Sequence, residues 1–335
     1  MSAKTSVQSG NTLSNIFARY GIVLVLVIMV VVLSVLSPIV RGEQFFLTPR
    51  NLIQVALQAS INAVIAVGMT MIIISGGIDL SVGAIVALGG IAAAYAMKAG
   101  SGPWIGFAVA VLAGTLCGVF NGFLITRFNL APFIATLGTM GIFRGIALVI
   151  SDGRPIYGFG REFLQLFAGN LGPLPFIGSI PVAVIVAAVA ALAMSFVLNQ
   201  LKLGKYTIAI GGNEEGTRLA GIPIKRYKVG IYALGGFLTG VAAALLTARL
   251  SSADPTAGNF FELDAIAASV IGGTSLSGGS GTIAGTIVGA LVISLVRNGM
   301  NIFNVPSYWQ EIAIGSVIIL AVILDQWRRA QAQRV

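Results

Sequence analysis

About ten long apolar segments, separated by short polar stretches, constrain this chain to a membrane fold. A helix needs about 20 apolar residues to cross the hydrocarbon core of a bilayer. The segments are residues 21–36, 55–75, 82–97, 104–126, 131–150, 181–198, 229–248, 263–275, 282–296 and 308–324. Because backbone groups in lipid must be paired within each segment, we expect an all-α membrane protein with about ten transmembrane helices.

The composition excludes several classes of protein. The chain is 56% hydrophobic and 9% charged, whereas soluble domains carry about 25% charged residues. The net charge of +9 does not indicate nucleic-acid binding, because the basic residues flank apolar segments instead of sharing one face. With no histidine and the single cysteine Cys117, neither a metal site nor a disulfide framework nor a Ser-His-Asp triad is expected.

Charge around the segments predicts which side of the membrane each loop faces. Residues 201–228 are rich in Lys and Arg, and residues 327–335 are also basic. Basic loops stay on the cytoplasmic side, and an even number of crossings separates both stretches from the N-terminus. We therefore expect a cytoplasmic tail over residues 1–20, a membrane domain over 21–326 and a cytoplasmic tail over 327–335. A signal peptide is the alternative for the first segment, but no small-residue cleavage site follows it.

The basic loop over residues 201–228 contains the signals of a short helix. Asn213 can cap its start, and Glu214 and Glu215 favour the positive end of the helix dipole. Gly221 followed by Pro223 predicts its end. The loop is either a solvated connector whose charge keeps it on the cytoplasmic side, or an element that a partner protein binds and moves.

Two glycine-rich stretches resemble each other. Residues 76–83 read GGIDLSVG and residues 272–279 read GGTSLSGG, and each lies between two apolar segments. Transporters are often built from internal repeats, with helices that break near the solute path. We therefore expect a pseudo-repeat with broken or re-entrant segments, and the short segment 263–275 is a candidate for one of them. The candidate path residues are Gly76, Gly77, Asp79, Ser81, Gly272, Gly273, Ser275 and Ser277.

Two charged residues lie where charge is costly. Asp79 faces an aqueous path or caps a helix that starts at Leu80. Arg144 is the only basic residue well within a predicted segment, and it needs a carbonyl or water as its partner. Both a structural and a transport role are open for Arg144.

The loop over residues 249–264 is expected on the external side. Arg249, Asp254 and Glu262 lie in it. These side chains are either part of a solvated loop or a docking surface for an external partner.

Glycines four residues apart form several ladders, which let helices approach closely in lipid. The ladders are Gly114, Gly118 and Gly122; Gly281, Gly285 and Gly289; Gly236 and Gly240; and Gly141 and Gly145. They indicate packing either within one subunit or between subunits.

No G-x-x-x-x-G-K-[ST] phosphate-binding motif occurs in the chain. Acidic residues inside the apolar segments are also few, so the chain has few side chains that could carry protons in a proton-coupled carrier. If the chain moves a solute uphill, we expect the energy to come from another subunit.

Five stretches together resemble a known family. They are NAVIAVGMTMIIISGGIDLSVG (62–83), APFIATLGTMGIFRG (131–145), GGNEEGTRLAGI (211–222), ARLSSADPTAG (248–258) and ELDAIAASVIGGTSLSGGSGTIAGT (262–286). The sequence resembles the membrane-spanning permease subunit of bacterial ABC sugar importers, most closely the ribose permease type.

The resemblance implies partners and roles. Family members pair with a second permease subunit in the bacterial inner membrane, bind a cytosolic ATPase and receive sugar from a periplasmic binding protein. They have no catalytic residues and no cofactor of their own, because the ATPase binds ATP and Mg. The segment GGNEEGTRLAGI corresponds to the ATPase-coupling loop, although it lacks the usual Ala-Ala pair. The coupling residues are then Asn213, Glu214, Glu215, Thr217, Arg218 and Gly221.

We thus expect the permease subunit of an ATP-driven importer for ribose or a related pentose. The alternative is a secondary carrier or facilitator that works alone on a small polar solute. The capped helix in the basic loop favours the importer.

Overall fold

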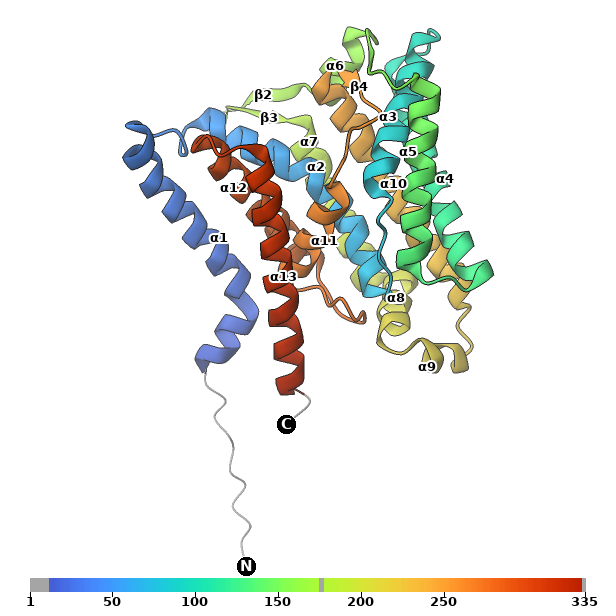
Figure 1. The fold of residues 1–335 in the computed structure, drawn as a ribbon. Coiled ribbons are helices and arrows are strands. Elements are labelled where there is room, and N and C mark those ends of the chain that lie inside the picture. The colour runs from blue at the N-terminus through green and yellow to red at the C-terminus, as the bar shows by residue number, and fades with distance from the viewer. Residues whose placement is uncertain (1–11, 175–177, 333–335) are drawn as a thin grey trace, which may run out of the picture.

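The computed structural model describes residues 12–174 and 178–332, and these residues are almost entirely helical (Figure 1). The helices are α1 (Thr12–Arg41), α2 (Pro49–Ile74), α3 (Val82–Lys98), α4 (Pro103–Phe128), α5 (Pro132–Ser151), α6 (Arg161–Phe167), α7 (Val182–Gln200), α8 (Lys202–Gly212), α9 (Glu214–Leu219), α10 (Ile224–Leu250), α11 (Phe261–Ile271), α12 (Ile283–Ile302) and α13 (Ser307–Ala332). The strands are β1 (Ile156–Tyr157), β2 (Asn170–Leu174), β3 (Gly178–Pro181) and β4 (Ser252–Ala253).

Among the described residues, seven helices are long and apolar enough to cross a membrane. They are α1 from Gly21 onward, α2, α4, α5, α7, α10 and α12. The prediction of an all-α membrane protein is therefore confirmed. The remaining three expected segments also lie on helices, namely α3, α11 and α13, but α3 has 17 residues and α11 only 11. The number of about ten crossings stays a prediction.

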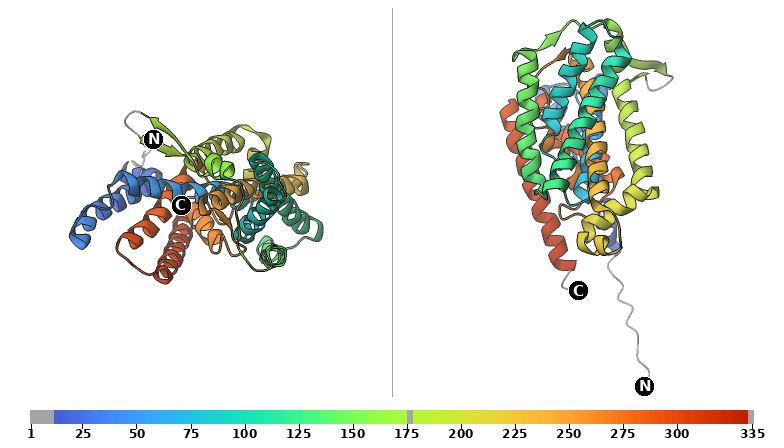
Figure 2. Two further views of the ribbon diagram at one scale, coloured as in Figure 1. Left: turned by 90° about the horizontal axis from the view of Figure 1, so that it is seen from above. Right: turned by 90° about the vertical axis from the view of Figure 1, so that its right-hand side faces the viewer.

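The two ends of the molecule differ (Figures 1 and 2). The start of α1, the end of α13 and the helices α8 and α9 lie at one end. The helix α6 and the four short strands lie at the opposite end. This arrangement agrees with the sequence prediction that the basic loop shares a side with both termini.

The strands form two small antiparallel pairs that the sequence patterns did not predict. In one pair, Ile156 of β1 lies opposite Ala253 of β4, which joins segments far apart in the sequence. The other pair joins β2 to β3. The pairs close the loop between α5 and α7 and attach it to the residues that follow α10.

Helix α2 is the centre of the bundle, and α1 lies at its edge (Figure 2). Of the most apolar stretch of α2, 89% of the residues are buried inside the protein, whereas only 6% are buried in the corresponding stretch of α1. The helix α2 packs against α7, α10, α11 and α12. Its nearly uniform apolar sequence suits a helix that other protein segments cover on all sides.

The glycine ladders mostly serve packing within this chain. A Cβ added at Gly114 of α4 would lie 2.8 Å from the Cα of Gly240 in α10, so this crossing requires glycine on both helices. Gly289 of α12 likewise lies against the backbone of Ala268 in α11. A Cβ added at Gly141 or at Gly145 of α5, in contrast, would meet no described atom within 4 Å.

Candidate transport site

The first break in the helices lies between α2 and α3, over residues 75–81. Thr136 of α5 accepts a hydrogen bond from the backbone N–H of Leu80 at 3.1 Å. The carboxylate of Asp79 accepts hydrogen bonds from the N–H and the hydroxyl of Ser81, at 2.8 and 2.6 Å, and from Asn121 of α4 at 3.3 Å. A side chain of α5 thus pairs with this non-helical backbone, and a side chain of α4 pairs with the carboxylate that holds the turn.

These contacts decide between the two roles expected for Asp79. The side chain is buried, with a relative exposure of 1%, and it does not face an aqueous path in this structure. Asp79 organises the turn before α3, which is close to the expected capping role. The helix, however, begins at Val82 and not at Leu80, and Ser81 is the residue before its first turn.

A second non-helical stretch, residues 254–260, runs between β4 and α11. The guanidinium of Arg144 in α5 donates hydrogen bonds to the carbonyl oxygens of Pro255 at 2.6 Å and Ala257 at 2.8 Å. In a membrane these carbonyls have no water to pair with, so a charged donor compensates for the missing helix. The partner of Arg144 is therefore backbone carbonyl, one of the two partners that the sequence left open.

The second break touches the start of α3, the helix that directly follows the first break. Gly83, at the start of α3, lies against Gly258, because a Cβ added to Gly258 would be 2.7 Å from the carbonyl oxygen of Gly83. Helix α5 holds both stretches, through Thr136 on the first and Arg144 on the second. A displacement of α5 would therefore act on both breaks.

The two glycine-rich stretches with similar sequences meet beside α8. The N–H of Gly279 donates a hydrogen bond to the carbonyl oxygen of Ile74, the last residue of α2, at 2.8 Å. A Cβ added to Gly278 would lie 3.0 Å from the Cα of Gly211 in α8 and 3.1 Å from the nitrogen of Gly76. The turn that carries Gly272, Gly273, Ser275 and Ser277 thus connects α11 to α12 at the α8 end of the bundle (Figure 1).

Gly211 is the point at which α8 fits between the two stretches. A Cβ on this residue would overlap the carbonyl oxygen of Ile74 and would lie 2.6 Å from the nitrogen of Gly279. Gly211 is the first residue of the stretch GGNEEGTRLAGI, and no local pattern in the sequence predicted this contact. The next residue, Gly212, has no described atom within 4 Å of an added Cβ.

The short helix α9 follows α8 directly, and its predicted cap is confirmed. The side-chain oxygen of Asn213 accepts a hydrogen bond from the N–H of Gly216 at 2.8 Å. Thr217 is buried and donates its hydroxyl to the carbonyl of Asn213 at 2.7 Å. Gly221 has φ +79, a conformation that favours glycine, and it ends the helical turn where the sequence predicted.

Two ion pairs involve the charged side chains of α9. Glu214 pairs with Lys228 of α10 at 2.7 Å, which ties the short helix to the next long one. Arg218 donates to Glu215 at 3.0 Å from its Nε, and this hydrogen bond lowers the pKa of the exposed Glu215 carboxyl. Next to this pair, Leu219 is 78% exposed. Single exposed apolar side chains are common on proteins, so Leu219 alone does not identify a binding surface.

The three residues expected to dock an external partner do not form one exposed cluster. Arg249 and Glu262 are half-buried, at the end of α10 and in the first turn of α11. Asp254 is half-buried too, and it accepts hydrogen bonds from the N–H and hydroxyl of Thr256, both at 2.7 Å. Their role in docking stays a prediction.

One partly buried ion pair was not predicted from the sequence. Arg297 lies inside α12, so Arg144 is not the only basic residue within a long helix as expected. Arg297 pairs with Asp264 of α11 at 2.9 Å. The expected apolar segment ended at residue 296, just before Arg297, whereas α12 continues to Ile302. Asp264 was placed where the expected external loop 249–264 overlaps the segment 263–275. The alternation of Asp264 with apolar neighbours on α11 was the available signal for its burial.

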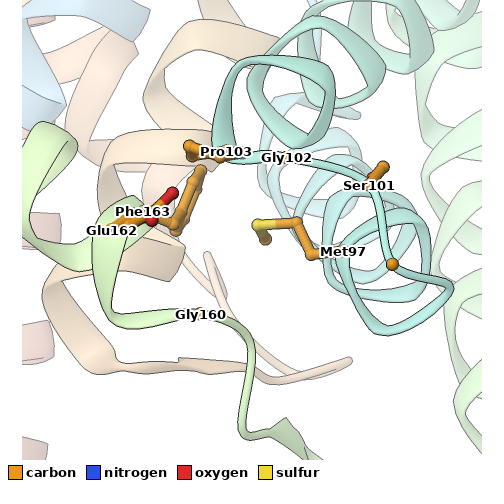
Figure 3. Close-up of a pocket in the computed structure, with 8 residues that line it drawn as sticks. Met97, Ser101, Gly102, Pro103, Gly160, Glu162 and Phe163 are labelled. Atoms are coloured by element: carbon orange, nitrogen blue, oxygen red, sulfur yellow. The ribbon is translucent and has the colours of Figure 1, made fainter.

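A pocket of about 380 Å³ is shown in Figure 3, at the end of the bundle that lies opposite α8 in Figure 1. It is lined by the turn between α3 and α4 and by the start of α6, and it contains none of the predicted path residues. The lining residues are Met97, Gly100, Ser101, Gly102, Pro103, Gly160, Glu162 and Phe163.

Comparison with known proteins gives a consistent result. Residues 51–322 match the family described as branched-chain amino acid transport system / permease component. The chain is 44% identical to a ribose import permease protein of Bacillus subtilis (strain 168), over 94% of this chain and 95% of that protein. It is 41% identical to a D-allose transport system permease protein of Escherichia coli (strain K12), over 92% and 91%. It is 37% identical to an L-arabinose ABC transporter permease protein of Azospirillum brasilense, over 93% and 89%. No solved structure gives a significant match.

Proposed function

We propose a function for this chain from one premise: the chain belongs to the permease-component family that its sequence matches over residues 51–322. It is the membrane-spanning subunit of an ATP-driven ABC importer, and it carries ribose or a related monosaccharide inward across a bacterial inner membrane. Relatives named for ribose, D-allose and L-arabinose support a sugar as the solute. The chain acts as a transport subunit and not as an enzyme.

The proposed topology has about ten crossings, with both terminal tails in the cytoplasm. The breaks at residues 75–81 and 254–260 complete the crossings that α3 and α11 are too short to make alone. The basic loop over residues 201–228 then faces the cytoplasm, as its charge requires.

The proposed partners follow from this topology. A cytosolic ATPase, which binds ATP and Mg, docks on α9 through Glu215, Arg218 and the exposed Leu219. A periplasmic binding protein delivers the sugar at the end that carries α6 and the strands. A second copy of the permease completes the solute path.

In the proposed mechanism, the contact at Gly211 transmits the movement of the ATPase to the membrane helices. Movement of the ATPase shifts α9, and α8 moves with it because only Asn213 separates the two helices. The Gly211 backbone then displaces the end of α2 and the turn before α12 together, since it lies against both. The glycine-rich stretches 76–83 and 272–279 reorient and expose the path to the opposite side of the membrane.

Reconstitution tests this function. Proteoliposomes that contain the permease, its ATPase and its binding protein are expected to accumulate D-ribose only when ATP is present. Accumulation by the permease alone, without an ATPase, would show a stand-alone carrier and refute the proposal.

Arg218→Ala tests the coupling surface in the same vesicles. An exposed ion pair contributes little to folding, so the variant is expected to insert and fold normally. Uptake is expected to fall about tenfold or more while ATP hydrolysis continues, as for a lost interface contact. Lys202→Ala, which removes an exposed positive charge from the same loop, is the control and should leave uptake unchanged. Normal uptake with Arg218→Ala would exclude this contact.

A further inference from the structure

The ion pair between Asp264 and Arg297 belongs to a polar cluster that connects three helices. The Nη2 atom of Arg297 in α12 donates to both carboxylate oxygens of Asp264, at 2.9 and 3.0 Å. Asn62 of α2 donates to the same carboxylate at 3.3 Å. The Asp264 side chain is 2% exposed, whereas that of Arg297 is 27% exposed, so the cluster can be reached through the guanidinium.

Several polar atoms around this cluster have no partner among the described residues. The Nε atom of Arg297 and the hydroxyl of Ser294 are buried without a hydrogen bond. Ser294 is 1% exposed and lies one turn before Arg297, on the same side of α12. The side-chain oxygen of Gln58 is also buried and unpaired, and Gln58 lies one turn before Asn62 on α2.

Buried polar groups normally find a partner, so a group of unpaired ones in a membrane bundle requires an explanation. A neighbouring pair shows what a purely structural contact between the same helices looks like. Asn51 of α2 and Asn298 of α12 exchange two hydrogen bonds, at 3.1 and 2.7 Å, and leave no side-chain atom unpaired. The cluster at Asp264 and Arg297 differs because it retains both donors and acceptors that are free to bind.

We propose that Asp264, Arg297, Asn62 and Ser294 bind hydroxyl groups of the sugar as it crosses the membrane. A sugar hydroxyl both donates and accepts, so it matches a carboxylate beside a guanidinium and an amide. Arg297 lies five residues before the end of α12, which lies opposite α8, so the site is near the external entrance on the proposed topology. This site rests on the proposed function, because it takes a monosaccharide as the solute.

The double variant Asp264→Leu, Arg297→Met tests the site in proteoliposomes with the ATPase and a saturating concentration of sugar-loaded binding protein. Replacing both members of a buried ion pair by apolar residues of similar size is often neutral for stability. The thermal unfolding temperature in detergent is therefore expected to stay within a few degrees of the unmodified protein. The rate of D-ribose uptake is expected to fall about tenfold or more, as for lost hydrogen bonds to a charged group. The matched control, Asn51→Leu with Asn298→Leu, removes a polar contact between α2 and α12 and should leave uptake unchanged.

Arg297→Lys is the second variant, because it keeps the charge and loses the planar fork. The site predicts a changed ratio of D-ribose to D-allose uptake, since lost hydroxyl contacts affect the two sugars differently. A merely structural pair would lower both rates by the same factor.

Normal uptake by the double variant would refute the site, and so would an equal loss in the Asn51 and Asn298 control. If the double variant does not fold, an unchanged sugar ratio with Arg297→Lys would refute it. Failure of the proposed function is seen separately, because the unmodified permease would then show no ATP-dependent D-ribose uptake.

Discussion

Replacing Gly211 by alanine should interfere with the contact between α8 and the two glycine-rich stretches. The added Cβ would overlap the carbonyl oxygen of Ile74 and approach the nitrogen of Gly279 to 2.6 Å. Both neighbours are backbone atoms, so neither can move aside as a flexible side chain would. Overpacking of this kind typically costs about 1–3 kcal/mol.

Gly212→Ala provides the matched control for this prediction. Both glycines lie in the last turn of α8, so each alanine gains a similar intrinsic helix stability of at most about 1 kcal/mol. An alanine at Gly212 meets no described atom within 4 Å, so it retains that gain. The difference between the two variants therefore isolates the overlap, and we expect Gly211→Ala to have the lower free energy of unfolding by about 1–3 kcal/mol.

Two measurements check this pair. Denaturant or thermal unfolding in detergent gives the stability difference, and sugar uptake in proteoliposomes with the ATPase gives the effect on transport. Gly211→Ala is expected to reduce uptake per ATP hydrolysed, whereas Gly212→Ala should not. Equal stability and equal uptake for the two variants would refute the role of α8 as the element that links α9 to the two glycine-rich stretches.

Three further variants test other contacts. Arg144→Met leaves the carbonyls of Pro255 and Ala257 without a donor, and should lower the free energy of unfolding by about 3 kcal/mol; an unchanged unfolding midpoint would contradict this. Asp79→Leu should destabilise more than Asp79→Asn by about 1–3 kcal/mol in the same assay, because asparagine still accepts from Ser81 and leucine does not. Asn213→Ala removes the cap of α9 at a cost of about 1 kcal/mol, so the backbone amide of residue 216 should exchange hydrogen about fivefold faster. Equal exchange rates in the two proteins would show that the cap does not hold this turn.

The sequence predicted the parts of the fold that depend on local signals. The long apolar runs specify helices such as α2 and α10, because a bilayer accepts little else. The cap at Asn213 and the helix end at Gly221 were predicted because a few neighbouring residues determine them. The likeness of residues 76–83 and 272–279 indicated two related irregular stretches, but not that they touch.

The remaining contacts depend on how distant segments pack, which no local pattern reveals. Arg144 was recognised as needing a partner, yet its two carbonyls lie more than a hundred residues further along the chain. The pairing of Asp264 with Arg297 was missed because one residue was assigned to a loop and the other was placed beyond the end of a segment. The strands β1 and β4 are two residues each, too short for an alternating pattern to show.

The tie between Glu214 and Lys228 gives the short helix α9 a second attachment. The first residue of α9, Glu214, follows α8 after Asn213 alone and is also fastened to Lys228 near the start of α10, a helix that runs the length of the bundle. A displacement of α9 by a partner is therefore transmitted both to α8 and to α10. Loss of the ion pair at Lys228 should leave the ATPase bound. Part of each movement of α9 would then bend the linker at residues 220–223 instead of moving α10. ATP hydrolysis would continue, but fewer sugars would be transported per ATP hydrolysed.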